Sequence, residues 1–428
     1  MALILLSLVS IRLVHYNVHL AVDFIVFILE EDHTKVTEVA QSPQGRTHYF
    51  ILIAVVVAAG LSQGLLLPVL AIFLERMGIS SSMNGLNAAA LYVGSFAMTL
   101  VAERVLGWVG FKKLIVSGLV LVMLSLLAFP LIPSVLFWFV LRVLVGIGDS
   151  ALHYAAQLWV LMMSNSKNRG RSISFYGMSY GLGFSIGPLG IPLLKYGEAV
   201  PFIVLSFLFL VILLIVIVKL PNWKPERSAE GIQQPKGRYR TSYRLAWFAL
   251  IPAFLYGYME AGINSNFPVY GLRSGLTLEQ ISILLPFVGI GGLLLQLPLG
   301  IWSDKFGRKR VLMFAGIIGG GCFMLIPAAG TDFVALLILL TIAGGMVGSF
   351  FSLGLAYAAD ILPRVLLPAA NVVASFHFNA GSIVGPNAGG AVLETGWNGG
   401  MFLLLGGLYI LFACMGLWFR AKSVSEQN

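Results

Sequence analysis

Residues 200–219 read VPFIVLSFLFLVILLIVIVK, a run in which only the final residue carries a charge. A helix rises about 1.5 Å per residue, so about 20 apolar residues cross the roughly 30 Å hydrocarbon core of a bilayer. The run therefore predicts a membrane-spanning helix.

The same pattern recurs along the chain, which is 58% hydrophobic and only 11% charged over 428 residues. Soluble domains carry about 25% charged residues. This composition excludes a soluble enzyme, a coiled coil, a disordered chain and a nucleic-acid-binding protein. The runs are too long and continuous for barrel strands. Twelve helical spans are predicted, at 48–73, 85–103, 113–133, 134–160, 172–194, 200–219, 246–270, 278–301, 310–328, 333–357, 368–392 and 399–419.

The segment that follows the first run is the longest polar stretch between spans. Residues 221–245 read PNWKPERSAEGIQQPKGRYRTSYRL, rich in Pro, Gly, Ser and charge, and they separate six spans from six. We expect a linker here between two helical bundles. The predicted organisation is an N-terminal extension (1–45), a six-helix bundle (46–219), the linker (220–245), a second six-helix bundle (246–420) and a short tail (421–428).

Lysines and arginines indicate the orientation, because positive charge accumulates in cytoplasmic loops. Placing the linker and the C-terminal tail in the cytoplasm puts twenty basic residues on that side. The opposite loops then hold only Arg76, Lys195 and Arg273. We therefore predict a multi-pass protein of the cell membrane with both ends of its helical core in the cytoplasm. The net charge of +9 then faces anionic lipid and needs no nucleic-acid partner.

The two halves repeat each other. Gly187-Pro188 is matched by Gly385-Pro386, and Gly146 by Gly344, each 198 residues later. Proline kinks a helix and glycine permits close helix approach, so the two Gly-Pro pairs predict a bend, a seal against leakage, or close packing alone. Parallel six-span repeats place a substrate site between the halves, near the midplane. The predicted fold is all-α, with twelve transmembrane helices in two pseudo-symmetric six-helix bundles.

Three sequence motifs lie in the loop after the eighth span, in the fifth span with its repeat in the eleventh, and in the fourth span. They are GIWSDKFGRKR at 300–310, GFSIGPLG at 183–190 with its echo at 381–390, and RVLVGIG at 142–148. Together they resemble the major facilitator superfamily, and in particular its twelve-helix drug:proton antiporter branch. The corresponding loop of the first half, 103–113, lacks an aligned Asp. The resemblance implies secondary transport by alternating access, in which the two bundles rock about a central site.

Glu260 is the predicted proton carrier. It lies in the middle of the seventh span without a basic neighbour on its helix, and Tyr256 and Asn264 lie one turn to either side. Charge inside a bilayer is costly, and loss of water favours the protonated form of a carboxyl. Some drug antiporters of the resembled family carry a carboxylate in this span. The alternative is a neutral Glu that is hydrogen-bonded to a tyrosine.

The fourth span carries Arg142, Asp149 and His153 on roughly one helix face. Asp149 is the second candidate for proton coupling, with Arg142 stabilising its ionised form or binding an anionic substrate. A static Arg–Asp pair that fixes helix packing is the alternative. His377 and Tyr180 are further candidates for the cavity wall, and a structural histidine and ordinary packing are their alternatives.

The loop between the eighth and ninth spans contains the clearest charged cluster, in which Gly307 lies between Asp304 and the bases Arg308 and Arg310. Asp304 is expected to cap the next helix or to pair with a base across the interface of the halves. Such a pair would hold the cytoplasmic side closed. The alternative is a solvated turn whose charges only set topology.

Several kinds of chemistry are absent from the sequence. There is no phosphate-binding loop or zinc-protease motif, and Cys322 and Cys414 are isolated in apolar runs. We therefore expect no enzymatic activity, cofactor or metal, and a monomer whose partners are protons, a small-molecule substrate and membrane lipid. The predicted function is proton-coupled export of small amphipathic or organic molecules. Proton-coupled import of a nutrient and lipid flipping are the alternatives.

Residues 1–45 fit the pattern poorly, because their apolar run contains Arg12, His15 and Asp23. One interpretation is a mis-assigned start, with translation beginning at Val36 or Val39. The other is an extension that lies on the surface or moves freely.

Overall fold

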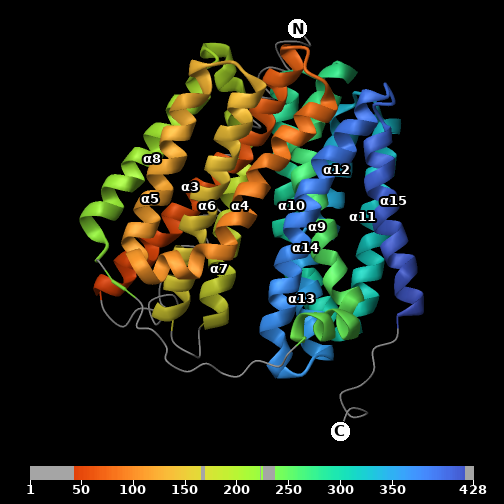
Figure 1. The fold of residues 1–428 in the computed structure, drawn as a ribbon. Helices are drawn as coiled ribbons and strands as arrows, with labels where there is room; N and C mark the ends of the chain where they lie inside the picture. The colour runs from red at the N-terminus through yellow and green to blue at the C-terminus, as the bar shows by residue number, and fades with distance from the viewer. Residues whose placement is uncertain (1–42, 165–168, 222, 225–236, 420–428) are drawn as a thin grey trace.

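The computed structural model describes residues 43–164, 169–221, 223–224 and 237–419. These residues form helices and connecting turns without a strand (Figure 1). The expectations for residues 1–42, for most of the linker and for the tail 421–428 lie outside the described residues. The predicted twelve-helix architecture is confirmed, and each predicted span falls on one pass of the chain.

The N-terminal half (N half) consists of described residues up to 219, and the C-terminal half (C half) begins at residue 237. The N half contains α3 (Pro43–Arg76), α4 (Ser81–Val109), α5 (Phe111–Ala128), η1 (Phe129–Leu131), α6 (Val135–Met163), α7 (Arg169–Ile186), η2 (Gly187–Tyr196) and α8 (Val200–Lys219). The C half contains α9 (Arg238–Ser274), α10 (Leu278–Phe306), α11 (Arg308–Ala329), α12 (Phe333–Val347), α13 (Phe350–Ile361), η3 (Arg364–Leu366), α14 (Leu367–Glu394) and α15 (Gly400–Trp418). Because α9 begins at Arg238, the final residues of the expected linker are helical.

Ten helical segments among the described residues are long and apolar enough to cross a membrane by length and composition. The fifth pass, α7 with η2, and the eleventh, α14, are not among them. Both are rich in Gly and Ser, and both pack against the opposite half, α7 and η2 on α10 and α14 on α4. Their lower hydropathy follows from this place at the interface.

The internal repeat is visible in the way the helices touch. A Cβ atom added to Gly146 of α6 would lie 1.9 Å from the carbonyl oxygen of Leu91 on α4. A Cβ atom added to Gly344 of α12 would lie 2.0 Å from the carbonyl oxygen of Val288 on α10. The two contacts are equivalent, because Gly344 follows Gly146 by 198 residues and Val288 follows Leu91 by 197 residues. Glycine is required at both positions because backbones approach this closely only without a side chain.

Both Gly-Pro pairs pack closely on a helix of their own half, and Pro386 also meets the N half, where a Cβ atom added to Gly85 of α4 would lie 2.4 Å from its carbonyl oxygen. A Cβ atom at Gly187 would lie 2.7 Å from backbone atoms of Gly64 and Leu65 on α3, and one at Gly385 would lie 2.3 Å from the carbonyl oxygen of Tyr258 on α9. The fifth pass changes to a 3₁₀ helix at Gly187, whereas α14 continues through Pro386 as an α-helix. Close packing is therefore common to both pairs, and the change of helix type belongs to the first alone.

The tenth pass is broken. α12 ends at Val347 and α13 begins at Phe350, with Gly348 and Ser349 between them. A Cβ atom at Gly348 would lie 2.6 Å from the Cα atom of Gly292 on α10. The equivalent pass of the N half, α6, is one uninterrupted helix of 29 residues.

The halves are joined at one end of the bundle. We call the end where α8 stops and α9 starts the linker end, and the opposite end the far end. Figure 1 shows the helices of the two halves meeting at the far end, drawn at the top, and diverging toward the linker end. Hydrogen bonds and ion pairs between described residues of the two halves lie toward the far end. They are Glu75–Arg273, Lys195–Glu279, Ser82–Glu394 and Asn84–Ser265.

Candidate functional site

Glu260 lies near the middle of α9 and is only 8% exposed. The hydroxyl of Tyr256, one turn earlier, donates to its Oε1 atom at 3.1 Å. Asn264 donates to the backbone carbonyl of Glu260 and not to the carboxyl group. Within the described part of the chain Glu260 forms no ion pair, so its carboxyl has one hydroxyl partner and no countercharge.

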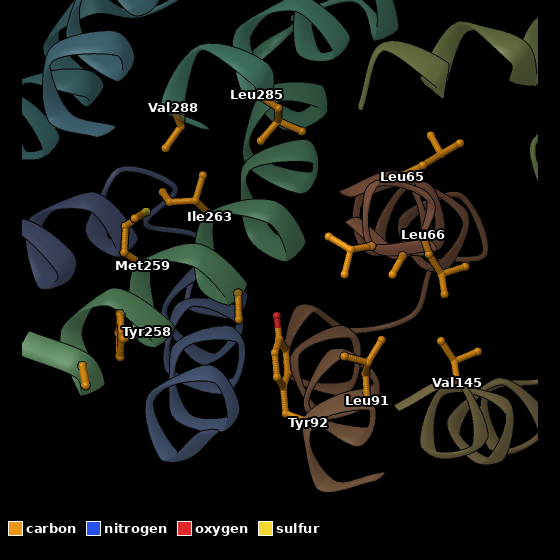
Figure 2. Packing of buried hydrophobic residues seen from close by; sticks show 14 of the residues in the cluster. Leu65, Leu66, Leu91, Tyr92, Val145, Tyr258, Met259, Ile263, Leu285 and Val288 are labelled. Atoms are coloured by element: carbon orange, nitrogen blue, oxygen red, sulfur yellow. The ribbon is translucent and has the colours of Figure 1, made fainter. Parts of the chain in front are cut away.

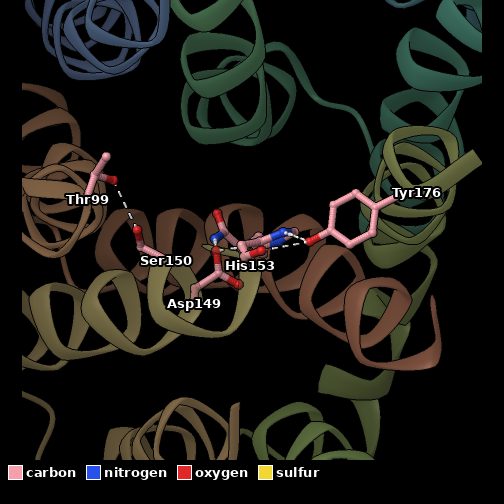
Figure 3. A network of polar contacts seen from close by, with 6 residues as sticks. Thr99, Asp149, Ser150, His153 and Tyr176 are labelled. Atoms are coloured by element: carbon pink, nitrogen blue, oxygen red, sulfur yellow. Dashed lines mark hydrogen bonds and ion pairs between the residues drawn. The ribbon is translucent and has the colours of Figure 1, made fainter. Parts of the chain in front are cut away.

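Asp149 of α6 belongs to a polar network inside the N half (Figure 3). The amide of Gln63, from α3, donates to its Oδ2 atom. The Nε2 atom of His153 lies 3.9 Å from the same oxygen, and Tyr176 of α7 reaches the other side of the imidazole. Three helices therefore fix the position of this carboxyl.

The hydrogen bonds of Tyr176 indicate the tautomer of His153. The single hydroxyl hydrogen of Tyr176 donates to the backbone carbonyl of His153 at 3.1 Å. The Nδ1 atom of His153, 2.9 Å from the same hydroxyl oxygen, must then be the donor to it. A neutral His153 therefore has a free lone pair on Nε2, and Nε2 has no hydrogen-bond partner among the described residues. At 3.9 Å from the Oδ2 atom of Asp149, Nε2 is near this carboxyl but not hydrogen-bonded to it.

Two tyrosines lie between the two acids. Tyr92 of α4 is within electrostatic range of both Glu260 and Asp149, and so is Tyr180 of α7. Figure 2 shows the Tyr92 hydroxyl directed toward the part of α9 that carries Ile263. The ring of Tyr180 contacts His153 edge-on, with ring centroids 4.8 Å apart. We call Tyr92, Asp149, His153, Tyr180, Tyr256 and Glu260 the central site.

The predicted pairing of Arg142 with Asp149 is not present in the described structure. Arg142 is fully buried, and none of its three side-chain nitrogens has a hydrogen-bond partner among the described residues. The physical reason is direction, because side chains on a helix lean toward its N-terminus, so Arg142 extends away from Asp149, which follows seven residues later and is bound by Gln63.

His377 lies outside the central site. Its ring stacks on Tyr243 with centroids 5.5 Å apart, and its Nδ1 atom is 2.8 Å from the carbonyl oxygen of Val373 on its own helix. Both contacts are with the C half, toward the linker end of α14. This is the environment of the structural histidine that the sequence left open.

The charged cluster of the loop after α10 is contained within the C half. Arg308 pairs with Asp304 at 3.1 Å and with Asp360 at the end of α13 at 2.6 Å. Gly307 has a φ of 92°, which allows the sharp turn into α11. Arg310 is exposed. The expected pair between Asp304 and a base of the other half is therefore absent from this conformation.

Sequence reasoning missed Gln63, Tyr92 and the far-end pair of Glu75 with Arg273. In that pair the guanidinium of Arg273 donates twice to the carboxylate of Glu75, at 2.7 and 2.9 Å. A signal for it existed, since Arg76 and Arg273 are the last charged residues of the first and seventh passes and Glu75 is adjacent. Helices related by a twofold axis meet at equivalent positions, so opposite charges there predict a contact.

Metal binding finds no support in the described residues, which contain no group of three or more His, Cys, Asp or Glu that could hold an ion. The central site contains two carboxyls, an imidazole and three phenols. Such groups exchange protons and bind polar organic groups.

Comparison with known proteins identifies relatives across nearly the whole chain. A profile described as Major Facilitator Superfamily matches residues 52–295 and 249–428. An "Uncharacterized MFS-type transporter YfkF" of Bacillus subtilis is 42% identical over 84% of this chain and 92% of its own. "Multidrug resistance protein 2" of the same organism is 25% identical over 68% of this chain and 76% of its own.

Solved structures agree on the fold. The nucleoside transporter NupG superposes with a TM-score of 0.71 at 14% identity, covering 88% of this chain and 99% of its own. The bacterial homologue of the lysosomal transporter Spinster superposes with a TM-score of 0.64 at 13% identity, covering 88% of this chain and 96% of its own. The chain is thus a multi-pass membrane transporter and belongs to the Major Facilitator Superfamily.

Proposed function

We propose that this protein is a proton-coupled exporter of small amphipathic or organic molecules that works by alternating access. The observation that carries the proposal is Glu260, a buried carboxyl without a countercharge at the interface of the halves. An ionisable group is retained in such a place when it faces a partner or a water-filled path. Glu260 takes up a proton when one face of the membrane opens to it and releases the proton at the other.

Asp149 has the second role. Its carboxyl contacts Gln63 and lies near His153, and Tyr176 holds the imidazole in place. A proton on Asp149 passes to the free Nε2 atom of His153 when the two atoms move from 3.9 Å to hydrogen-bond distance. Tyr92 and Tyr180 are within electrostatic range of both Asp149 and Glu260. The two acids then couple the binding of a proton to the relative position of the halves.

The arrangement of the halves supports a conformation that is closed at the far end. The ion pairs Glu75–Arg273 and Lys195–Glu279 join the halves there, while the helices diverge toward the linker end (Figure 1). The excess of lysine and arginine in the linker-end loops favours a cytoplasmic location for that end. The conformation therefore faces the cytoplasm, from which an exporter takes its substrate.

Two sequence similarities favour export over import. The fifth-pass motif resembles that of antiporters, and a relative at 25% identity bears the name "Multidrug resistance protein 2". We further propose that the protein resides in the cell membrane and acts as a monomer. Uptake measured in vesicles of known orientation distinguishes export from nutrient import, and headgroup translocation measured in the same vesicles tests lipid flipping.

The test is Glu260→Gln in proteoliposomes with an imposed pH gradient and a lumenal pH reporter, scanned against a substrate panel. Glutamine keeps the size and polarity of the side chain but cannot exchange a proton. We expect gradient-driven transport to fall below about a hundredth of wild type, with binding and exchange largely intact. Glu198→Gln, an exposed acid in the far-end loop, is the matched control. Undiminished uphill transport by Glu260→Gln would remove Glu260 from the mechanism.

A further inference from the structure

Arg142 is the least satisfied side chain in the described structure. It is 0% exposed, and its Nε, Nη1 and Nη2 atoms all lack a hydrogen-bond partner among the described residues. The guanidinium keeps its charge and has five N–H donors with no acceptor. A buried charge without a partner is strongly destabilising, so this position requires an acceptor in some state of the transport cycle.

The acids nearby do not supply that acceptor. Asp149 lies two turns further along α6 and is held by Gln63, and Glu260 is held by Tyr256. Neither forms an ion pair with Arg142 within the described ranges. The acceptor must therefore come from outside this part of the chain.

Tyr92 provides a second, independent indication of a missing ligand. Its hydroxyl is also buried without a hydrogen-bond partner among the described residues, and its chain neighbour Leu91 touches the backbone of Gly146, one helical turn after Arg142 on α6. Gly94 and Gly146 hold α4 and α6 at backbone contact, with added Cβ atoms only 2.1 and 1.9 Å from the carbonyl oxygens of Val143 and Leu91. The two unsatisfied donors are thus fixed on a rigid pair of helices.

We propose that Arg142 and Tyr92 form a subsite for the anionic group of the transported molecule, which makes amphipathic organic anions the substrate class. The proposal rests on the proposed function, since it names what the exporter carries. A carboxylate or phosphate can accept two parallel N–H donors from Arg142 and the O–H of Tyr92. The Tyr92 hydroxyl points toward α9, so an anion held there lies between the halves (Figure 2).

The subsite is covered in the described conformation. Tyr92 is 5% exposed and Arg142 is not exposed at all, so in the described conformation the surrounding side chains cover both donors. An anion reaches them when α4 and α9 part, which is the movement that alternating access requires. The neighbouring rings of Tyr180 and Tyr256 suit the apolar part of the same molecule.

The test is equilibrium binding to the purified full-length protein in nanodiscs of phosphatidylcholine, without a pH gradient. The probes are 1-naphthoate, 1-naphthamide and 1-naphthylmethylamine, which share one ring system and differ in charge. We expect naphthoate to bind at least tenfold more tightly than the other two. Equal or weaker binding of naphthoate, or its absence, would overturn the proposal. This readout does not depend on Glu260 or on proton coupling, so its failure is distinct from failure of the proposed function.

Variants then locate the anion. Arg142→Met should weaken naphthoate binding about tenfold or more, and Tyr92→Phe about threefold, because each removes donors to a charged group. The exposed residues Arg104 and Tyr196 provide the matched controls Arg104→Met and Tyr196→Phe, for which no change is expected. Undiminished naphthoate binding by both test variants would overturn the assignment.

A structural role for Arg142 predicts a different outcome. Since methionine removes an unpaired buried charge, Arg142→Met should leave the melting temperature of the empty protein unchanged or raised. A marked fall would indicate that Arg142 holds the fold together and would overturn the subsite. Adding phosphatidylglycerol to the nanodiscs tests a lipid source. Displacement of naphthoate by this lipid would assign the anion to a headgroup and contradict a transported organic anion.

Discussion

Position 63 of the N half and position 260 of the C half are equivalent, 197 residues apart in the repeat, yet one carries an amide and the other a carboxyl. On the fourth and tenth passes the difference is reversed. Arg142 and Asp149 of the N half correspond, 198 residues later, to the buried apolar residues Leu340 and Val347. Each half therefore holds charges where the other holds none.

The comparison shows which features duplication retained and which it did not. The glycine contacts that set the helix spacing, such as Gly146 on Leu91 and Gly344 on Val288, occur in both halves. The ionisable groups are divided instead, with the base and one acid in the N half and the other acid in the C half. A symmetric frame thus carries an asymmetric site, which is what a carrier needs if one proton and one substrate are to be handled differently.

The largest effect is expected from breaking the symmetric frame. Gly146→Ala and Gly344→Ala each force a Cβ atom within about 2 Å of a carbonyl oxygen, so both should destabilise the fold by about 3 kcal/mol and prevent recovery of monodisperse protein. Size-exclusion profiles and melting temperatures measure this. Gly321→Ala, where the new methyl group meets nothing within 4 Å, is the control and should be neutral. Well-folded protein from either test variant would contradict the close packing.

The second prediction tests whether the acid of the C half can be moved to the equivalent position of the N half. Gln63→Glu places a carboxyl at the position equivalent to Glu260, but it faces Asp149, to which the lost amide had donated. We expect the double variant Gln63→Glu/Glu260→Gln to retain less than about a tenth of gradient-driven transport, since two acids crowded in one network cannot replace one acid in each half. Glu198→Gln in the exposed far-end loop is the control. Restored uphill transport would show that the two positions are interchangeable.

The smallest effect concerns the linker-end loops. Asp304 corresponds to Gly107 in the N half, and Arg308 corresponds to Phe111. Because Arg308 retains Asp360 when Asp304 is lost, Asp304→Asn should change stability by less than about 1 kcal/mol. We expect turnover to fall about threefold with probe binding unchanged, if Asp304 takes a base of the other half when the linker end closes. If Asp304→Asn turns over at the wild-type rate, Asp304 has no part in closing the linker end and is only a surface charge. Gly107→Asp places an acid at the equivalent position of the N half, where Phe111 stands in place of Arg308, and it should leave turnover unchanged.

Much of the fold could be predicted from local composition. The twelve spans and the repeat follow from apolar runs and from glycine positions, because a bilayer imposes helix length and close packing imposes glycine. Glu260 was identifiable for the same reason, since a lone acid in an apolar run has few explanations. The hydrogen bond from Tyr256 is the one that the alternative, a neutral Glu bonded to a tyrosine, predicts, and residues four apart share a helix face. The proton-carrier role stays a prediction.

The remaining features depend on which helices meet. The bond of Gln63 to Asp149 joins passes far apart in sequence, and no local pattern contains it. A shared helix face does not place Arg142 and Asp149 in contact, because helical side chains lean toward the N-terminus and Arg142 precedes Asp149. Asp304 was expected to reach across the interface, whereas Arg308 binds it locally, because the far end is the closed one in this conformation.

The interruption at Gly348 and Ser349 has a consequence for how force passes through the molecule. An uninterrupted helix such as α6 moves as one rigid body, so a displacement at one membrane face is passed on to the other face. In the tenth pass, Gly348 and Ser349 interrupt the helix between α12 and α13, although φ/ψ angles of −59°/−26° and −90°/3° keep the chain running in nearly the same direction. The two halves therefore differ in the continuity of equivalent passes, and bending of the tenth pass is expected to concentrate at these two residues.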